Sequence, residues 1–304
     1  MGKPDSFAIE KTRKTASLNT RCHIGSCAWT CEDWRGSFYP ADLPADRWLA
    51  WYARSFNAVE IDSTFHAIPP PHTVARWLSE APPHFRFTCK VPKIITHQLR
   101  LRGCQTLLAE FLGAMQPLHG HLGAILIQLP PSFSPAGDST ALRDFILGLP
   151  RGWKFAIEFR HADWHQPRFV KLIEDHGVCW VWTDTTSVAG QRQAPFGFLP
   201  ETADFLYVRL MGDLQTKYAP DGGRIHRYRE LLWSREAAID SWAVRLHKQA
   251  EHIKAIYILC SNHYEGFAPE TCRRLGERLG VEITLPSPAD PVPAGKGPRQ
   301  LRLL

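Results

Sequence analysis

The sequence predicts a single (β/α)8 TIM barrel, and two observations carry that prediction. Eight short runs rich in β-branched and aromatic residues recur along the 304-residue chain, and most stretches between them have helical periodicity. Alternating strands and helices are typical of a parallel sheet, and eight such units take about 250 residues when they close into a barrel. The barrel domain is predicted over residues 22–285.

The eight runs are predicted strands, and most of them end in a charged or amide residue. In chain order they are 23–29, 58–63, 86–92, 124–130, 154–160, 178–184, 205–211 and 255–262. Successive side chains of a strand point to opposite faces, so one set should pack against helices and the other should face the barrel axis. In the fifth run, Ala156, Glu158 and Arg160 are predicted to point inward.

Seven segments between these runs are predicted helices. They are 46–56, 72–81, 104–118, 139–149, 167–177, 226–253 and 269–280. The fifth begins at Pro167 and ends at Gly177, as helices commonly do, and the fourth opens on a Ser or Thr that could cap it. Residues 185–204 lack the pattern, so we expect an irregular or missing helix between the sixth and seventh strands.

Composition excludes several classes of protein. The chain is 44% hydrophobic and 22% charged, as ordinary globular domains are, and it has no apolar run of about 18 residues that would predict a membrane span. The N-terminus is polar and basic, without the apolar core of a secretory signal. Its eight cysteines form no C-x-x-C pair, so we expect reduced thiols, a cytoplasmic location and no membrane partner.

The net charge of +6 lies mainly in two predicted tails. Residues 1–21 contribute +3 and residues 286–304 contribute +2, which leaves +1 for the barrel. Both tails are rich in polar residues, Pro and Gly, so we predict that they are flexible. The basic surplus therefore does not make the folded body a nucleic-acid binder, although a local basic patch could still bind nucleic acid.

Charged residues at the strand ends are the candidates for catalysis, because TIM barrels carry their active sites at the carboxyl ends of the strands. Glu60 and Glu158 are predicted acid/base groups, and Lys90 and Arg160 are predicted to neutralise developing negative charge. Inward charges need partners. The structural alternative is that Glu158 pairs with Arg160, and Glu60 with Lys90, merely to close the barrel mouth.

A second set of polar and aromatic residues near strand ends is predicted to bind the substrate. It comprises Trp29, Asp62, His97, Gln128, His161, Asp184, Arg209, Tyr218 and Asn262. Within this set Arg209 would offset negative charge, and Gln128 and Asn262 would orient the substrate. Aromatic rings such as Trp29 and Tyr218 could stack on bases or sugars, although most tryptophans in a barrel pack its core.

The loops after the seventh and eighth strands favour a polar, phosphorylated small molecule, because TIM barrels often bind phosphate there. The first loop offers Lys217 and Arg224, and free amides of a helix near Pro269 would attract an anion. A flexible, solvated loop is the alternative.

Candidate metal ligands also follow the strand ends, among them His66 and His263, but three or more must converge to bind a divalent metal. The spacings H-x-x-x-H and H-E-x-x-H are absent, and cations at the mouth offset the carboxylates. No metal and no cofactor is therefore assigned.

Several segments resemble one known family. They are HIGSCAWTCEDWRGSFYP at 23–40, FNAVEIDSTFH at 56–66, FRFTCKVPKIITH at 85–97, QLPPSF at 128–133, EFRHADW at 158–164, YVRLMG at 207–212 and SNHYEGFAPET at 261–271. In this order they resemble the YecE-like family, domain of unknown function 72. The resemblance implies a TIM barrel distantly similar to sugar isomerases and apurinic endonucleases, and it supplies no reaction. Cys27 and Ala28 stand where the family usually has Ser and Gly, and Met211 stands where His is common.

Together these observations predict an enzyme, a hydrolase, lyase or isomerase, that acts on a phosphate- or sugar-containing substrate at the carboxyl-terminal mouth of the barrel. One alternative is a non-catalytic protein that binds nucleic acid or a phosphorylated ligand. Another is a metal-dependent isomerase or endonuclease-like enzyme. The oligomeric state is not predicted.

Overall fold

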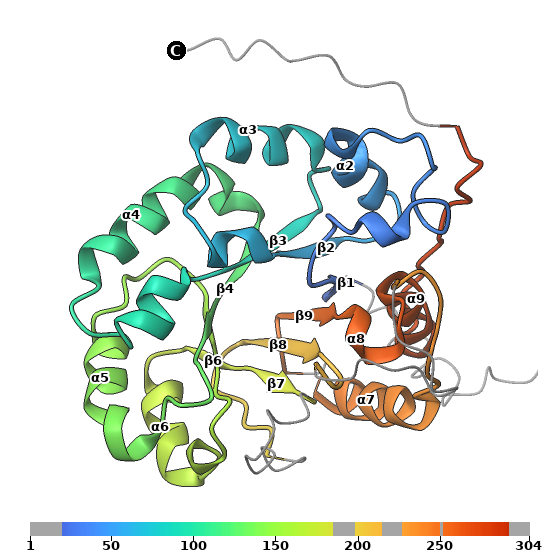
Figure 1. Ribbon diagram of the computed structural model, residues 1–304. Coiled ribbons are helices and arrows are strands. Elements are labelled where there is room, and N and C mark those ends of the chain that lie inside the picture. Colours follow the sequence, from blue (N-terminus) through green and yellow to red (C-terminus); the bar gives the residue numbers. More distant parts are fainter. Residues whose placement is uncertain (1–19, 185–197, 215–226, 250–251, 292–304) are drawn as a thin grey trace, which may run out of the picture.

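The computed structural model describes residues 20–184, 198–214, 227–249 and 252–291. Its strands form one parallel sheet that curls into a nearly closed barrel, with helices around the outside (Figure 1). The strands are β1 Cys22–Ser26, β2 Ala58–Ile61, β3 Arg86–Lys90, β4 Leu122–Gln128, β5 Phe155–Glu158, β6 Cys179–Trp180, β7 Trp182–Thr183, β8 Phe205–Leu210 and β9 Ala255–Cys260. The sheet order is β6-β5-β4-β3-β2-β1-β9-β8-β7.

The two ends of this order, β6 and β7, are one predicted strand divided in two. β6 pairs with β5 and β7 pairs with β8, and Val181 alone separates them. The Val181 amide still donates to the Ile157 carbonyl at 2.9 Å. Cys179 and Val181 pack inside the barrel, whereas Trp180 and Trp182 pack outside it, so the alternation continues through the break. The predicted TIM-barrel fold is confirmed, with eight strand positions around the ring.

The α-helices surround the barrel, and most of them lie on the outer face of the sheet (Figure 1). They are α2 Trp48–Tyr52, α3 Pro71–Glu80, α4 Gln105–Met115, α5 Pro135–Leu147, α6 Pro167–Asp175, α7 Glu236–Gln249, α8 Asn262–Glu265 and α9 Ala268–Leu279. Short helical turns are η1 Glu32–Trp34, η2 Ala45–Arg47, η3 Asp62–Phe65, η4 Ile94–Gln98, η5 Gln116–His121 and η6 Ala162–Trp164. None of the helices in the described part of the chain has the length and apolar character needed to cross a bilayer.

Two helices begin well away from the predicted positions. α5 begins at Pro135, because proline suits the first helical position, so the expected Ser or Thr cap at the start of 139–149 is wrong. α7 begins at Glu236 rather than near residue 226, because the amides of Leu232 and Trp233 donate to the Glu265 carbonyl instead of forming helical bonds. Between β7 and β8, residues 198–204 contain no helix.

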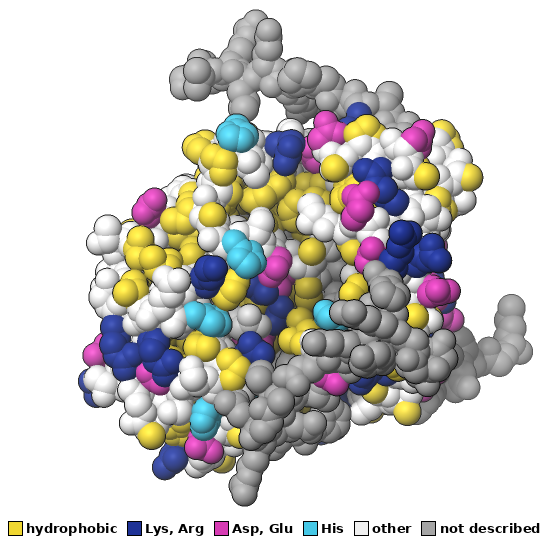
Figure 2. Space-filling view, viewed as in Figure 1, with side chains coloured by type: hydrophobic (Ala, Val, Ile, Leu, Met, Phe, Trp, Pro, Cys, Tyr) yellow, Lys and Arg dark blue, Asp and Glu magenta, His cyan; other side chains and the backbone are white. Residues whose placement is uncertain are grey.

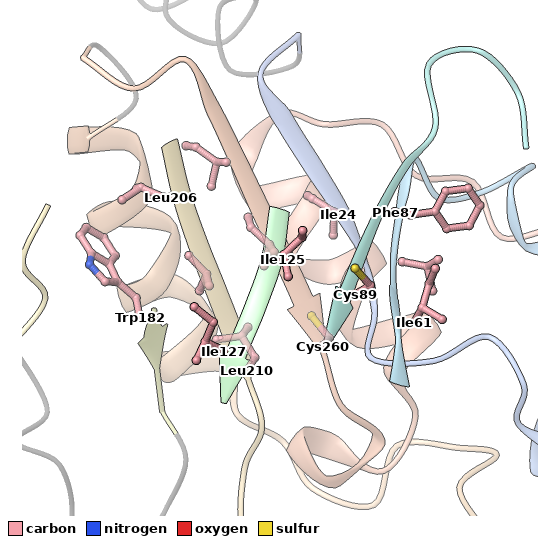
Figure 3. Packing of buried hydrophobic residues seen from close by; sticks show 14 of the residues in the cluster. Ile24, Ile61, Phe87, Cys89, Ile125, Ile127, Trp182, Leu206, Leu210 and Cys260 are labelled. Carbon is pink, nitrogen blue, oxygen red and sulfur yellow. The ribbon is translucent and has the colours of Figure 1, made fainter. Parts of the chain in front are cut away.

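The apolar side chains form an outer and an inner cluster. The outer cluster fills the space between the sheet and the helices, and Figure 3 shows part of it, with Ile24, Ile61, Phe87, Cys89, Ile125, Ile127, Trp182, Leu206, Leu210 and Cys260 labelled. The inner cluster is smaller and consists of Ala124, Leu126, Ala156, Cys179, Val181, Phe205, Tyr207, Ala255, Tyr257 and Leu259. Each large apolar side chain that is fully buried contributes about 1.5–3 kcal/mol.

The inner cluster fills the barrel from the amino ends of the strands, and the charged residues lie beyond it. On β8, for example, Phe205 and Tyr207 belong to the inner cluster and Arg209 follows on the same face. Across the sheet Gln128 is in register with Glu158. The predicted tails, 1–21 and 286–304, lie largely outside the described residues.

Candidate active site

A buried guanidinium joins two strands across the carboxyl end of the barrel. Arg209 Nη1 donates to Glu158 Oε2 at 2.5 Å, and Arg209 Nη2 donates to Glu60 Oε1 at 2.8 Å. Arg209 and Glu60 are 0% exposed and Glu158 is 1% exposed. A buried charge is costly unless it is paired, so Arg209 is the partner that both buried carboxylates need.

Neighbouring polar groups complete the hydrogen bonding of both carboxylates. The Gln128 amide donates to Glu158 Oε1 at 2.9 Å. Burial alone would raise the pKa of Glu158, but Arg209 and Gln128 outweigh it and hold that pKa below its usual range. The Tyr207 hydroxyl donates to Glu60 Oε2 at 2.7 Å and lies 2.8 Å from Thr88 Oγ1.

Sequence reasoning missed Tyr207 and Thr88, although a signal for both exists. Tyr207 precedes Arg209 by two residues, and Thr88 precedes Lys90 by two, so strand alternation places each on the inward face with its charged neighbour. Burial, and then the charge of Glu60, raise the pKa of Tyr207 well above its ordinary value. Its hydroxyl is therefore a permanent donor to Glu60.

Lys90 links this buried network to solvent. Its Nζ lies 3.5 Å from Glu60 Oε1 and 2.5 Å from Asp62 Oδ1, so the predicted pair of Glu60 and Lys90 is present. The side chain of Lys90 is 10% exposed, whereas that of Asp62 is 45% exposed. The hydroxyl of Thr64 accepts the Lys90 amide at 3.0 Å and fixes the end of β3. Asp62 is thus the solvent-facing member of the network.

A cavity of about 270 Å³ opens above these groups. Asp62, Lys90 and Arg209 line it, together with residues that follow β1, β8 and β9, but Glu60 and Glu158 do not. Figure 2 shows Lys, Arg, Asp, Glu and His side chains gathered around the hollow in the middle of this face. A molecule in the cavity would meet Asp62 and Lys90 first, with the two glutamates behind them.

Arg160 lies near the mouth and does not pair with Glu158. β5 ends at Glu158, so the strand alternation that would have placed Arg160 beside it does not continue, and Arg209 takes that place. The expected pair of Glu158 and Arg160 is therefore wrong. Among the described residues, no carboxylate lies within ion-pair distance of the half-buried Arg160 guanidinium. Its positive charge lowers the pKa of Glu158 and of His97.

Two of the predicted substrate contacts lie on the rim. Burial, and then Arg160, lower the pKa of His97, whose Nδ1 is 2.8 Å from Thr96 Oγ1. Its ring meets that of Phe65 edge to face, with centroids 5.0 Å apart. His161 Nδ1 accepts the Asp163 amide at 3.3 Å. Neutral His97 can therefore donate or accept a hydrogen bond at the rim. The His161 side chain instead caps the turn that follows it.

Asp184 holds the turn after β8. It accepts the amides of Met211 at 2.8 Å and Gly212 at 3.4 Å, and burial raises its pKa to about 6. Gly212 has a φ of 64°, and a Cβ there would lie 2.3 Å from the His263 carbonyl oxygen, so only glycine fits. Asp184 does not line the mouth cavity.

The Asn262 side chain makes structural hydrogen bonds. Its Oδ1 accepts the Trp34 indole N–H at 3.2 Å and the Ala268 amide at 2.9 Å, and its Nδ2 lies 3.5 Å from Cys31 Sγ. The Ala268 amide is the first of α9, so one of the donors expected to attract an anion there already has an acceptor. The predicted loop residues Lys217, Tyr218 and Arg224 lie outside the described residues.

Two positions that depart from the family pattern lie together in the mouth. Cys27 Sγ is 3.7 Å from Met211 Sδ and 4.0 Å from Arg209 Nη2. Burial raises the pKa of Cys27, so it is a neutral thiol. In the part of the chain that the structure describes, no group of three or more His, Cys, Asp or Glu side chains could hold a metal ion.

A family model described as "Protein of unknown function DUF72" matches residues 23–295. The UPF0759 protein YecE of Escherichia coli O157:H7 is 42% identical over 149 residues, which are 47% of this chain and 54% of that protein. For YecE of Escherichia coli strain K12 the match covers 41% of the relative, so the matches span about half the length of these two proteins. The UPF0759 protein YunF of Bacillus subtilis is 26% identical over 294 residues, 92% of this chain and 99% of that protein.

Solved structures agree with the barrel. A DUF72 family protein from Thermotoga maritima superposes with a TM-score of 0.70 and 25% identity, covering 85% of this chain and 99% of its own. A DUF72 family protein from Enterococcus faecalis V583 gives a TM-score of 0.68 at 20% identity, covering 86% of this chain and 97% of its own.

Proposed function

Because the chain belongs to the DUF72 family, whose description assigns no activity, we propose its function from the geometry of its own barrel mouth. The proposal is an enzyme that acts on a small phosphate- or sugar-containing substrate. The observation that carries it is a charge network, Glu158, Arg209, Glu60, Lys90 and Asp62, that is sealed at one end and faces a cavity at the other.

A purely stabilising role is a poor explanation for this network. Buried ion pairs add little stability compared with apolar residues of similar size, because the charges must leave water. Most of the barrel interior already consists of such apolar residues. Charges that replace them only at the carboxyl end, where barrel enzymes bind their substrates, favour a functional role.

Lys90 and Arg160 are the proposed anion anchors. Lys90 is a cation at the floor of the cavity, and Arg160 is near the mouth with no carboxylate partner among the described residues. An anionic group of the substrate at Lys90 would compete with Asp62 for the ammonium group. That exchange would free an exposed carboxylate to accept a proton from the substrate.

The sequence analysis predicted that Glu60 and Glu158 are the acid/base groups, but their geometry favours a positioning role instead. Both carboxylates are buried, both accept from Arg209, and neither lines the cavity. They hold Arg209 in place, and Glu60 also lies within ion-pair distance of Lys90. Gln128 positions Glu158, and neutral His97 is available as a hydrogen-bond partner near Arg160.

Binding of inorganic phosphate and of sugar phosphates, followed by calorimetry, tests the anchor. Replacing Lys90→Met removes one charge-assisted hydrogen bond, so we expect binding to weaken about 10- to 100-fold. Lys254→Met is the matched control, because this lysine is exposed and pairs with Asp204 at the amino end of the barrel. Undiminished phosphate binding in a folded Lys90→Met variant would contradict the proposal.

Proton transfer is tested separately on whichever sugar phosphate is converted. Asp62→Asn keeps the shape of the side chain and removes its basicity, so turnover should fall about 10²- to 10⁴-fold while binding is retained. Glu158→Gln should lower turnover less than Asp62→Asn does. The reverse order would return the proton-transfer role to Glu158.

A further inference from the structure

A second cavity, of about 230 Å³, lies beside the mouth between the segment after β1 and helix α3. Ala28 and Asp62 line both cavities, so the two adjoin at the exposed carboxylate of the charge network. Its wall includes two tryptophans, Trp29 and Trp77, whose rings meet edge to face with centroids 5.8 Å apart. The predicted contact Trp29 therefore lines this side cavity rather than the mouth.

Both tryptophans carry an indole N–H without an acceptor. Trp29 is 7% exposed and Trp77 is 4% exposed, yet neither indole has a hydrogen-bond partner among the described residues. Five other buried indoles of this fold do have one: they donate to the Asn262 side chain or to the carbonyls of Leu43, Phe38, Phe133 and Pro200. Neither indole nitrogen belongs to the buried, unpaired polar atoms of the described residues, so both N–H groups are accessible and can donate to acceptor oxygens of a ligand in the side cavity.

The charged side chains around the cavity define the rest of the ligand. Asp46, Asp62 and Glu80 oppose Arg76, an excess of carboxylates that repels an anion and accepts hydroxyl protons. Burial, opposed by Arg76 and aided by Asp46, raises the pKa of Glu80 to about 7. Near neutral pH this carboxyl can donate or accept. The lining therefore combines indole groups that donate hydrogen bonds with carboxylates that accept them. Such a lining suits a ligand with several hydroxyl groups, because each hydroxyl can both donate and accept.

We infer that the side cavity is a subsite for a hydroxylated ring, a sugar or similar polyol, of the substrate whose anionic group binds at Lys90. This inference rests on the proposed function and deepens it. The bond between the two parts of the substrate would then pass over Asp62, which lines both cavities and is the proposed base. The substrate class is a phosphorylated sugar rather than a free phosphate or an apolar phosphate ester.

Calorimetric titration with inorganic phosphate, D-ribose 5-phosphate, D-glucose 6-phosphate, phenyl phosphate and free D-glucose tests this inference on the full chain. At least one sugar phosphate should bind about 10-fold more tightly than inorganic phosphate, and phenyl phosphate should show no such gain. Trp77→Phe keeps an aromatic ring and removes the N–H, and Glu80→Gln alters the carboxyl without changing its shape. Each should reduce the gain about 5-fold and leave inorganic phosphate binding unchanged.

Trp153→Phe is the matched control, because Trp153 lies just before β5 at the opposite end of the barrel, and it should leave all affinities unchanged. Equal affinity for inorganic phosphate and both sugar phosphates, or an undiminished gain in both Trp77→Phe and Glu80→Gln, would overturn the subsite alone. Free glucose that binds in a Trp77-dependent manner, without phosphate binding, would retain the subsite and reject the phosphate anchor. Failure of every probe to bind would reject both.

Discussion

The two ends of the barrel interior are built from the same strands and differ in kind. At the amino end Phe205, Ala255 and Tyr257 fill the axis with apolar atoms, and no charge lies among that inner cluster. At the carboxyl end Arg209 bridges two buried carboxylates and Lys90 opens the network to solvent. On β8 a single inward position, that of Tyr207, separates Phe205 from Arg209, so one strand provides both the core and the site.

This difference shows that the residues that form the core and the residues of the candidate site lie on the same strands, at opposite ends, rather than in separate domains. The amino end is filled mainly by apolar side chains, whose burial stabilises the fold. The carboxyl end keeps charges that are costly to bury, and the costs are limited because each charge has a partner. Changes at the two ends should therefore separate loss of stability from loss of binding.

The largest effect should follow removal of the central cation. Arg209→Met leaves Glu60 and Glu158 buried without their shared partner, which should destabilise the fold by about 3–5 kcal/mol at neutral pH, measured by urea unfolding. Arg143→Met removes an exposed pair with Asp144 and should cost about 0–1 kcal/mol. If Arg209→Met cost no more than this control, the network would not be a buried, mutually dependent unit.

The pH dependence of Arg209→Met sharpens the same comparison. In the native protein the pKa of Glu158 is depressed, so its contribution is present above the unfolded pKa and is lost as the pH falls. Without Arg209, burial raises the pKa of Glu158 above its unfolded value, and the variant should become relatively more stable as the pH falls. The two stability curves should approach each other toward about pH 4.

A smaller effect is expected at the apolar end. The pairing of β3 with β4 is irregular at Gly123, and a Cβ there would lie 2.4 Å from the Tyr257 ring across the barrel. Gly123→Ala should therefore destabilise the protein by about 1–3 kcal/mol through overpacking, while phosphate binding stays unchanged. In contrast, Gly113→Ala on α4 meets nothing within 4 Å and should stabilise the helix by about 1 kcal/mol. Impaired binding in folded Gly123→Ala would show that the two ends are coupled.

The inward charges were predictable from the sequence, because strand alternation depends only on local spacing. Glu60, Lys90, Glu158 and Arg209 all lie on inward faces for that reason. The pair of Glu60 and Lys90 was also predictable, but the partner of Glu158 was not, because it depends on where the strand ends: β5 stops at Glu158, so Arg209 rather than Arg160 becomes its partner. The spacing of residues in the sequence does not show at which residue a strand ends.

Long-range contacts explain the remaining differences between the prediction and the structure. The start of α7 is set by the carbonyl of Glu265, far along the chain, and the side cavity at Trp29 depends on the packing of α3. Asn262 was predicted to orient a substrate, and the structure shows that its side-chain oxygen also accepts from Trp34 and Ala268. None of these contacts leaves a periodic signal in the sequence.

The smallest effect concerns Asp184, whose pKa of about 6 lies above its ordinary value of 3.8 because of burial. A carboxyl group with a raised pKa contributes stability below its unfolded pKa and loses it as the pH rises through the folded pKa. Wild type should thus lose stability relative to Asp184→Asn between about pH 4 and pH 6, while the Asn carbonyl still accepts the Met211 amide.

Denaturant unfolding at several pH values measures this difference, and Glu158→Gln provides a control of opposite sign. The pKa of Glu158 is depressed, so its replacement should matter less as the pH falls, whereas replacing Asp184 should help more as the pH rises. Parallel curves for Asp184→Asn and wild type would mean that water reaches this carboxylate freely. Asp184 would then belong with the solvated rim, and the buried, charged end of the barrel would be confined to the network around Arg209.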